Sequence, residues 1–169
     1  VYMLGYSAGA FMTTRFACQA TSRLAGAAMI AGFGNNEQPL FTDLCPSAGA
    51  AIPIMLVASQ QDPYYSYGGG PIVCYAGATF CPMGFSSGAR VMLRQFVIRN
   101  DCFALPTESP LAASTGAGTR ISYDGCTNAV MRVDRLEDPN HEYYGAPGAA
   151  EQTYRATDQV WEFLRTKTR

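Results

Sequence analysis

The feature that most limits the fold of this 169-residue chain is an uninterrupted apolar run at residues 52–58, Ile-Pro-Ile-Met-Leu-Val-Ala. A strand with one face in water alternates apolar and polar residues. A run without alternation is typical of a parallel strand that is covered on both faces. The run therefore favours an α/β arrangement, in which helices flank a sheet.

Other patterns add strands and helices around this run. Strands are predicted at residues 1–4, 24–31, 52–58, 119–123 and 129–136. Helices are predicted at residues 8–22, 86–100 and 150–166. Loops are predicted at residues 35–51, 60–85, 105–118 and 137–149. Ser86 or Ser87 is expected to cap the second helix, and the third is expected to bury Tyr154, Val160, Trp161 and Leu164. This order predicts an α/β fold with a mostly parallel sheet.

Charge and hydropathy exclude two classes of partner. Charged residues make up 15% of the chain, the net charge is −1, and no stretch is dense in Lys and Arg. We therefore expect no nucleic-acid partner. No apolar run approaches the ~20 residues of a membrane span, so we expect no membrane partner. The length is that of one domain.

The six cysteines indicate disulfides rather than a metal site. They are Cys18, Cys45, Cys74, Cys81, Cys102 and Cys126. No C-x-x-C pair occurs and the chain has one histidine, so we expect no bound metal and no cofactor. An even cysteine count with low charge fits an oxidising compartment, and we expect a secreted protein. Six buried thiols in a cytosolic protein are the alternative.

Two segments match the pattern G-x-S-x-G, which can present a reactive serine. Residues 5–9 read Gly-Tyr-Ser-Ala-Gly and residues 84–88 read Gly-Phe-Ser-Ser-Gly. Such a serine needs a strand that turns sharply into a helix. The predicted elements supply both around Ser7, whereas Ser86 follows a Gly- and Tyr-rich loop. Ser7 is therefore the candidate nucleophile, with a turn serine in an ordinary strand–helix junction as the alternative.

A serine hydroxyl needs a base that takes its proton and an acid that orients the base. His141 is the only histidine and follows the last predicted strand. Asp62 closely follows the strongest predicted strand, at the end where α/β active sites form. Asp138 is the rival acid, although a turn with Pro139 suits it better. Four other aspartates are less suitable, because they lie in an early loop, beside cysteines or inside a strand: Asp43, Asp101, Asp124 and Asp134.

The reaction of such a serine also requires backbone donors for the oxygen that becomes negative. The N–H of Ala8, next to the candidate nucleophile, is one expected donor. We expect the second donor upstream of residue 1. The tyrosine-rich stretch at residues 64–75 could serve either as a binding platform or as packing.

Four segments resemble one known family. Residues 1–12 resemble its V-Y-V-x-G-x-S-A-G-G-x-M, residues 59–69 its G-x-x-D-x-x-V-P-Y-x-G-G, residues 123–126 its Y-x-G-C, and residues 156–163 its closing helix. This is the esterase/polyhydroxybutyrate depolymerase family, which includes secreted feruloyl and acetylxylan esterases. Two features depart from it: Ala10 replaces a glycine, and residues 138–145 replace the family's G-G-x-H-x-W-P-G.

The resemblance implies the α/β-hydrolase fold, with residues 1–169 as part of an esterase domain whose upstream strands are missing. It implies a serine carboxylic-ester hydrolase that forms an acyl-enzyme on Ser7, with His141 and Asp62. The expected substrates are feruloyl or acetyl esters on polysaccharides, or a polyhydroxyalkanoate polyester. It also implies a disulfide between Cys102 and Cys126. By remainder and loop size, the other expected pairs are Cys18–Cys45 and Cys74–Cys81. A non-catalytic binding protein and a serine peptidase of the same fold are the alternatives.

Overall fold

The computed structural model describes residues 1–34, 45–46, 48–71, 85–86, 88–112 and 116–168. The strands are β1 (Tyr2–Tyr6), β2 (Gly26–Ile30), β3 (Ile54–Ser59), β4 (Gly70–Pro71), β5 (Phe85–Ser86), β6 (Thr107–Pro110), β7 (Gly118–Tyr123) and β8 (Met131–Leu136). The helices are α1 (Ala8–Gln19), the short 3₁₀ helix η1 (Thr21–Arg23), α3 (Ala89–Arg99) and α4 (Ala156–Leu164). The chain is of the α/β class.

Six strands form one mixed sheet in the order β1-β2-β3-β8-β7-β6. The pairings β1–β2, β2–β3 and β3–β8 are parallel. The pairings β8–β7 and β7–β6 are antiparallel. The expected mostly parallel sheet therefore holds for the part from β1 to β8, and an antiparallel edge completes it.

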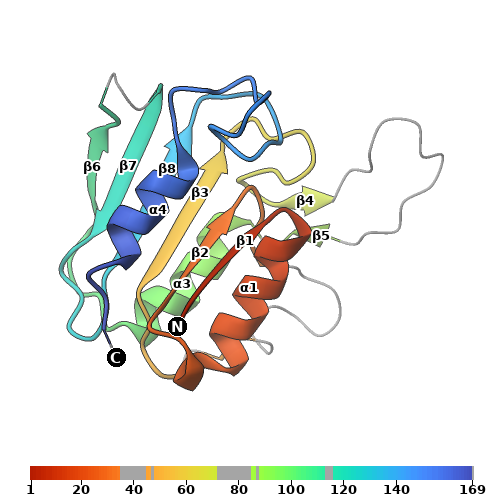
Figure 1. The fold of residues 1–169 in the computed structure, drawn as a ribbon. Coiled ribbons are helices and arrows are strands. Elements are labelled where there is room, and N and C mark those ends of the chain that lie inside the picture. Colours follow the sequence, from red (N-terminus) through yellow and green to blue (C-terminus); the bar gives the residue numbers. More distant parts are fainter. Residues whose placement is uncertain (35–44, 47, 72–84, 87, 113–115, 169) are drawn as a thin grey trace.

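Helices cover both faces of this sheet (Figure 1). Side chains of α1 and α3 pack on one face, in a core that includes Met29, Leu56 and Val133. Side chains of α4 pack on the other face, against Ile30 and Val57. Every residue of β3 is buried, because this central strand meets helices on both sides. This agrees with the unbroken apolar run that predicted it.

Several elements differ from the expectations, and β6 and the last helix are two examples. β6 lies within the predicted loop at residues 105–118. The sequence does not predict this strand because all of its residues are exposed and one is a proline, so apolar and polar residues do not alternate. The two-residue strand β4 likewise lies within the predicted loop at residues 60–85. The last helix begins at Ala156 instead of residue 150. The Glu142 carboxylate accepts hydrogen bonds from the N–H groups of Ala150 and Glu151, at 2.7 and 2.6 Å. These bonds hold that backbone in a loop.

Two side-chain expectations at the helices were also wrong. Trp161 is 59% exposed. Among the described residues its one aromatic contact is with Tyr2, and the two rings are nearly perpendicular. Helix α3 begins at Ala89 with Gly88 at its N-cap, in a positive-φ conformation. Ser86 belongs to β5 and does not cap this helix, and Ser87 lies outside the described residues.

The structure contains the expected disulfides Cys18–Cys45 and Cys102–Cys126. The first joins the end of α1 to the segment before β3. The second joins the chain after α3 to the chain after β7. Cys74 and Cys81 lie outside the described residues. These two disulfides fit an extracellular protein.

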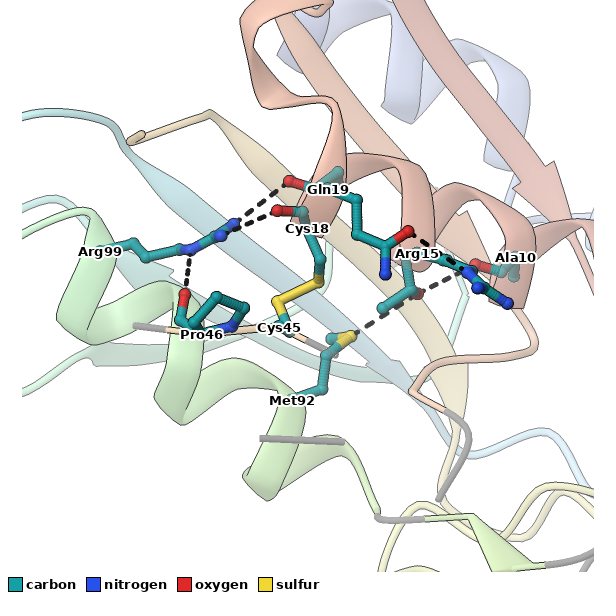
Figure 2. The surroundings of a disulfide bond; sticks show 10 residues. Ala10, Arg15, Cys18, Gln19, Cys45, Pro46, Met92 and Arg99 are labelled. Carbon is teal, nitrogen blue, oxygen red and sulfur yellow. Dashed lines mark hydrogen bonds between the residues drawn. A yellow bond between two sulfur atoms is a disulfide. The ribbon is translucent and has the colours of Figure 1, made fainter. Parts of the chain in front are cut away.

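A buried arginine reinforces the first disulfide (Figure 2). The Arg99 side chain donates to the carbonyl oxygens of Ala17, Cys18 and Pro46, at 3.2, 2.8 and 2.7 Å. The guanidinium thus joins the same two segments as the Cys18–Cys45 bond. It also supplies donors to carbonyls at the C-terminal end of α1, where the helix leaves them unpaired.

Replacing Arg99 by methionine is expected to lower the free energy of unfolding by about 2–4 kcal/mol, because buried carbonyls lose their donors. Urea unfolding measures this difference. Arg94→Met on the exposed side of the same helix is the matched control and should change stability by less than about 0.5 kcal/mol. Equal stability of both variants would show that the Arg99 contacts contribute little.

A buried carboxylate ties α4 to the sheet. Asp134 in β8 is fully buried. It accepts hydrogen bonds from Arg120 at 3.0 and 3.1 Å and from Arg132 at 3.0 and 2.5 Å. The Tyr154 hydroxyl donates to it at 2.6 Å, and Gln159 of α4 accepts from both arginines. Burial alone raises the pKa of Asp134, but the two arginines outweigh it and hold this pKa below its ordinary value.

Asp134→Asn is expected to lower the free energy of unfolding at pH 7 by roughly 3–5 kcal/mol, because the arginines lose a buried partner. The folded-state pKa is depressed, so the stabilisation is complete above the unfolded carboxyl pKa of ~3.9. It is lost as the pH falls through the lower folded pKa. Urea unfolding between neutral and strongly acidic pH should therefore show the two proteins converging in acid. The exposed Asp124→Asn is the control, and a constant difference at all pH values would contradict the assignment.

Candidate active site

Ser7 stands at a sharp turn between β1 and α1. Its backbone has φ 53° and ψ −120°, a strained conformation for a residue with a side chain. Its N–H donates to the Ile30 carbonyl oxygen at 3.0 Å. A side chain at Gly5 would place its Cβ 2.1 Å from the Gly9 carbonyl oxygen. The small residues of the motif thus allow the helix to fold back closely on the strand.

His141 lies between Ser7 and Asp62 and is hydrogen-bonded to both. Its Nε2 is 2.9 Å from Ser7 Oγ, and its Nδ1 is 2.7 Å from Asp62 Oδ2. The side chains of His141 and Asp62 are 11% and 2% exposed. Water therefore competes little for the bond between ring and carboxylate.

The parallel part of the sheet brings these three residues together. Ser7 directly follows β1, Asp62 follows β3, and His141 follows β8. Strands β1, β2, β3 and β8 run in parallel, so their carboxyl ends share one edge of the sheet. This is the upper edge in Figure 1, where the loop after β8 lies next to the end of β3. Side chains 134 residues apart in the sequence consequently meet.

The loop after β3 fixes the Asp62 carboxylate. Asp62 Oδ1 accepts hydrogen bonds from the N–H groups of Tyr64 and Tyr65, at 2.8 and 2.9 Å. The other oxygen, Oδ2, faces His141. Each oxygen therefore has a defined partner, and the carboxylate can hold one orientation of the imidazole.

Among the described residues, three tyrosine rings surround His141, and sequence reasoning missed one of them, Tyr6. Tyr6 stacks on the imidazole with ring centroids 5.5 Å apart, and its hydroxyl donates to the His141 carbonyl oxygen at 3.2 Å. The rings of Tyr64 and Tyr65 each lie edge-on at 5.1 Å. Tyr6 occupies a variable position of the serine motif, so the motif gives no signal for it. The tyrosine-rich stretch at residues 64–75 did give a signal for Tyr64 and Tyr65, and the rings of these two residues border the site.

Ser59, also missed, connects the acid loop to the histidine loop. It ends β3 and is completely buried. Its hydroxyl donates to the carbonyl oxygen of Asp138 and accepts the N–H of Gln61, the latter at 3.0 Å. One side chain thus holds the starts of both loops, which fixes the distance between Asp62 and His141. No sequence pattern distinguishes this serine from any other at a strand end.

The rival acid, Asp138, forms a turn. Its Oδ1 accepts the backbone N–H and the side-chain amide of Asn140, at 3.2 and 2.7 Å. This is the local bonding expected of an aspartate in a turn. Burial raises the pKa of this carboxyl, and the neighbouring Glu142 adds to the effect. Asp138 therefore shapes the histidine loop, and Asp62 is the carboxylate that is hydrogen-bonded to the imidazole.

The other two expectations concern Ala8 and the second serine motif. Ala8 opens α1, so its N–H is among the first of the helix, which have no partner inside it and lie at the positive end of its dipole. It adjoins Ser7, as the sequence predicted. Ser86 belongs to a two-residue strand that pairs with β4, and no helix begins directly after it.

Neither metal ligands nor a membrane span are found in the part of the chain that the structure describes. No group of three or more His, Cys, Asp or Glu side chains there could hold a metal ion. None of the described helices has the length and apolar character to cross a bilayer.

Comparison with known proteins assigns no family to this chain. The arrangement of Ser7, His141 and Asp62 is therefore supported by its geometry alone. The resemblance to an esterase family rests only on the four sequence segments named above. No protein-family model matches the sequence, and no curated protein matches it.

Proposed function

We propose that this protein is a serine carboxylic-ester hydrolase that works through an acyl-enzyme intermediate. The observation that carries the proposal is the continuous hydrogen-bond chain from Ser7 Oγ through His141 to Asp62, with distances of 2.9 and 2.7 Å. A nucleophile next to a base, with the base oriented by a third group, is the signature of covalent catalysis by serine.

In the first half of the reaction, Ser7 Oγ bonds to the carbonyl carbon of the ester while its proton passes to His141 Nε2. The electron pair of the carbonyl double bond moves onto the carbonyl oxygen. When it returns, the bond to the alcohol oxygen breaks, and this oxygen takes the proton from His141. The products of this half are the free alcohol and an acyl group on Ser7.

In the second half, water repeats the attack on the acyl carbon. His141 takes one proton of the water and returns it to Ser7 as the acid leaves. Asp62 remains ionised and stabilises the imidazolium that forms in both halves. The N–H of Ala8, at the positive end of α1, suits the negative oxygen of each tetrahedral intermediate.

We further propose the α/β-hydrolase fold. The parallel order β1-β2-β3-β8, the strained serine between a strand and a helix, and the chain order Ser, Asp, His all support it. The likeness of four segments to the esterase/polyhydroxybutyrate depolymerase family suggests the substrate class: feruloyl or acetyl esters on polysaccharides, or a polyhydroxyalkanoate polyester. The two disulfides support a secreted protein.

A fluorophosphonate that reacts with activated serines tests the proposal directly. The protein is incubated with the probe, and mass spectrometry locates the adduct. Turnover is measured in parallel with p-nitrophenyl acetate and with a p-nitroanilide peptide. We expect one adduct, at Ser7, and rapid release of p-nitrophenol.

Other outcomes identify the alternatives. Folded protein without an adduct and without turnover indicates a non-catalytic binding protein. An adduct at Ser7 with faster cleavage of the anilide indicates a peptidase. Acetylated and feruloylated xylan oligosaccharides and a hydroxybutyrate oligomer then rank the natural ester classes by kcat/KM.

A further inference from the structure

Tyr6 connects the strand that carries the nucleophile to the loop that carries the base. It is the last residue of β1, where it pairs with Ile30 of β2, and Ser7 follows it directly. Its hydroxyl donates to the His141 carbonyl oxygen at 3.2 Å, although the two residues are 135 positions apart in the sequence. Its ring stacks on the imidazole, with centroids 5.5 Å apart and planes 25° apart. One side chain therefore contacts both the main chain and the ring of the proposed base.

The hydrogen bonds of the triad leave one motion of the imidazole unrestrained. Nδ1 bonds to Asp62 and Nε2 to Ser7, and a ring nitrogen forms such bonds in the plane of its ring. These bonds therefore resist tilting out of that plane only weakly. The side-chain torsion that turns the ring, χ2, has a broad minimum in histidine. A second ring stacked on the face opposes the tilt, because tilting loses the stacked contact.

Tyr6 is itself held firmly enough to act as this restraint. Its side chain packs against the core between the sheet and α4, and the ring of Tyr143 meets it edge-on at 5.7 Å. Burial raises the pKa of Tyr6, and the nearby charges of Asp62 and Glu142 raise it further. The phenol therefore keeps its proton and remains a donor to the His141 carbonyl oxygen.

The restraint from Tyr6 persists at the stage where the serine no longer provides one. In the acyl-enzyme, Ser7 Oγ carries the acyl group and has no proton to donate to His141 Nε2. The imidazole then keeps its bond to Asp62 and its stacking on Tyr6. Water must meet Nε2 in the orientation that the alcohol oxygen has just left, so a ring that tilts freely would slow this step.

Resting on the proposed function, we propose that Tyr6 is a positioning residue for the base: its ring and hydroxyl together hold the His141 imidazole in the plane that faces Ser7. Tyr6 transfers no proton and acts only through His141. Because Tyr6 and Ser7 are adjacent in the chain, the strand that places the nucleophile also places the base.

Two variants separate the ring of Tyr6 from its hydroxyl. Tyr6→Leu removes both, and we expect kcat for p-nitrophenyl acetate to fall by about 10²-fold, the loss that a small misplacement of a reacting group causes. Tyr6→Phe keeps the stacked ring and loses one hydrogen bond, so its kcat should fall by only about 2- to 10-fold. KM should change by less than about 3-fold in both, because the lost interaction acts on the chemical step.

NMR of the histidine ring reports the positioning without any turnover. The chain has one histidine, so isotope-labelled histidine gives signals from this ring alone. The proton on Nδ1, held between the imidazole and Asp62, should give a sharp signal in the wild type, because it is protected from exchange with water. We expect this signal to broaden or vanish in Tyr6→Leu and to remain in Tyr6→Phe.

Tyr2→Leu is the matched control in the same strand. The Tyr2 side chain packs against the same core as Tyr6, and its hydroxyl also donates to a backbone carbonyl oxygen, that of Lys167, at 2.6 Å. Its ring meets Trp161 rather than the imidazole. Tyr2→Leu should therefore cost stability in urea unfolding, as Tyr6→Leu does, and should keep the wild-type kcat and the Nδ1 proton signal.

The outcomes distinguish this proposal from the proposed function. A wild-type kcat and proton signal in Tyr6→Leu overturn the positioning role while the esterase assignment stands. A rise in KM alone also overturns it, because Tyr6 would then only bind substrate. Equal losses of kcat in Tyr2→Leu and Tyr6→Leu do the same, since both would reflect lost packing. If Tyr6→Leu does not fold, a wild-type kcat in Tyr6→Phe overturns the role of the hydroxyl bond. A wild type that turns over no ester, with a proton signal that still depends on Tyr6, rejects the proposed function alone.

Discussion

Ser7→Ala is expected to lower kcat for ester hydrolysis by about 10⁶-fold, the loss that follows removal of a triad serine. Without Oγ no acyl-enzyme can form, and His141 has no proton to accept from the chain. Substrate binding requires no Oγ, so KM should change little. Steady-state rates of p-nitrophenol release measure the effect, with the spontaneous reaction subtracted.

Ser86→Ala is the matched control, because the chain offers a second G-x-S-x-G at residues 84–88. Ser86 follows no parallel strand of the main sheet and belongs to the two-residue strand β5. Its replacement should leave kcat within about 2-fold of wild type. The reverse result, an inactive Ser86→Ala with an active Ser7→Ala, would show that the second motif carries the nucleophile and that the strand–turn–helix setting failed to identify it.

The core of the fold was predictable because its elements are buried on both sides. The unbroken run at residues 52–58 and the apolar run at residues 24–31 correspond to β3 and β2. Both are covered by helices, so their composition directly reports their environment. β6 has no such signal, because all of its residues face solvent and only pairing with β7 makes it a strand.

The end of the chain shows a different limit of sequence patterns. Apolar spacing predicted one helix from residue 150, although the segment before Ala156 is a loop. The competing interaction lies within the loop: the Glu142 carboxylate, eight residues earlier, accepts the N–H of Ala150. Such a side-chain bond to the backbone competes with helix formation, and apolar spacing alone does not reveal it.

The candidate site was predictable where chemistry restricts the choice of residue. A single histidine and a serine between a strand and a helix left only the acid to be chosen. Its position after a parallel strand favoured Asp62, which now lies 2.7 Å from the imidazole. The residues that hold the triad, Tyr6 and Ser59, act through stacking and through bonds to backbone groups. Many residue types occur at such positions, so composition and spacing cannot mark them.

Asp62→Asn is expected to lower kcat by about 10⁴-fold with little change in KM. The amide keeps the shape of the carboxylate, and its oxygen can still accept the N–H groups of Tyr64 and Tyr65. Its NH₂ group then faces His141 Nδ1, which must accept a hydrogen bond. The imidazole proton is forced onto Nε2, so the nitrogen that faces Ser7 becomes a donor and can no longer act as the base. The imidazolium also loses its counter-charge.

Asp138→Asn is the control that distinguishes the two carboxyls. An asparagine oxygen can still accept from Asn140, as Asp138 Oδ1 does, so the turn should survive and kcat should fall by less than about 10-fold. Raising the pH separates the variants further. Alkaline conditions supply more hydroxide as an external base and should partly restore Asp62→Asn, because its defect is the missing base. A larger loss of kcat in Asp138→Asn than in Asp62→Asn would mean that Asp138, in the same loop as His141, orients the imidazole. The hydrogen bond between Asp62 and His141 would then only stabilise the fold.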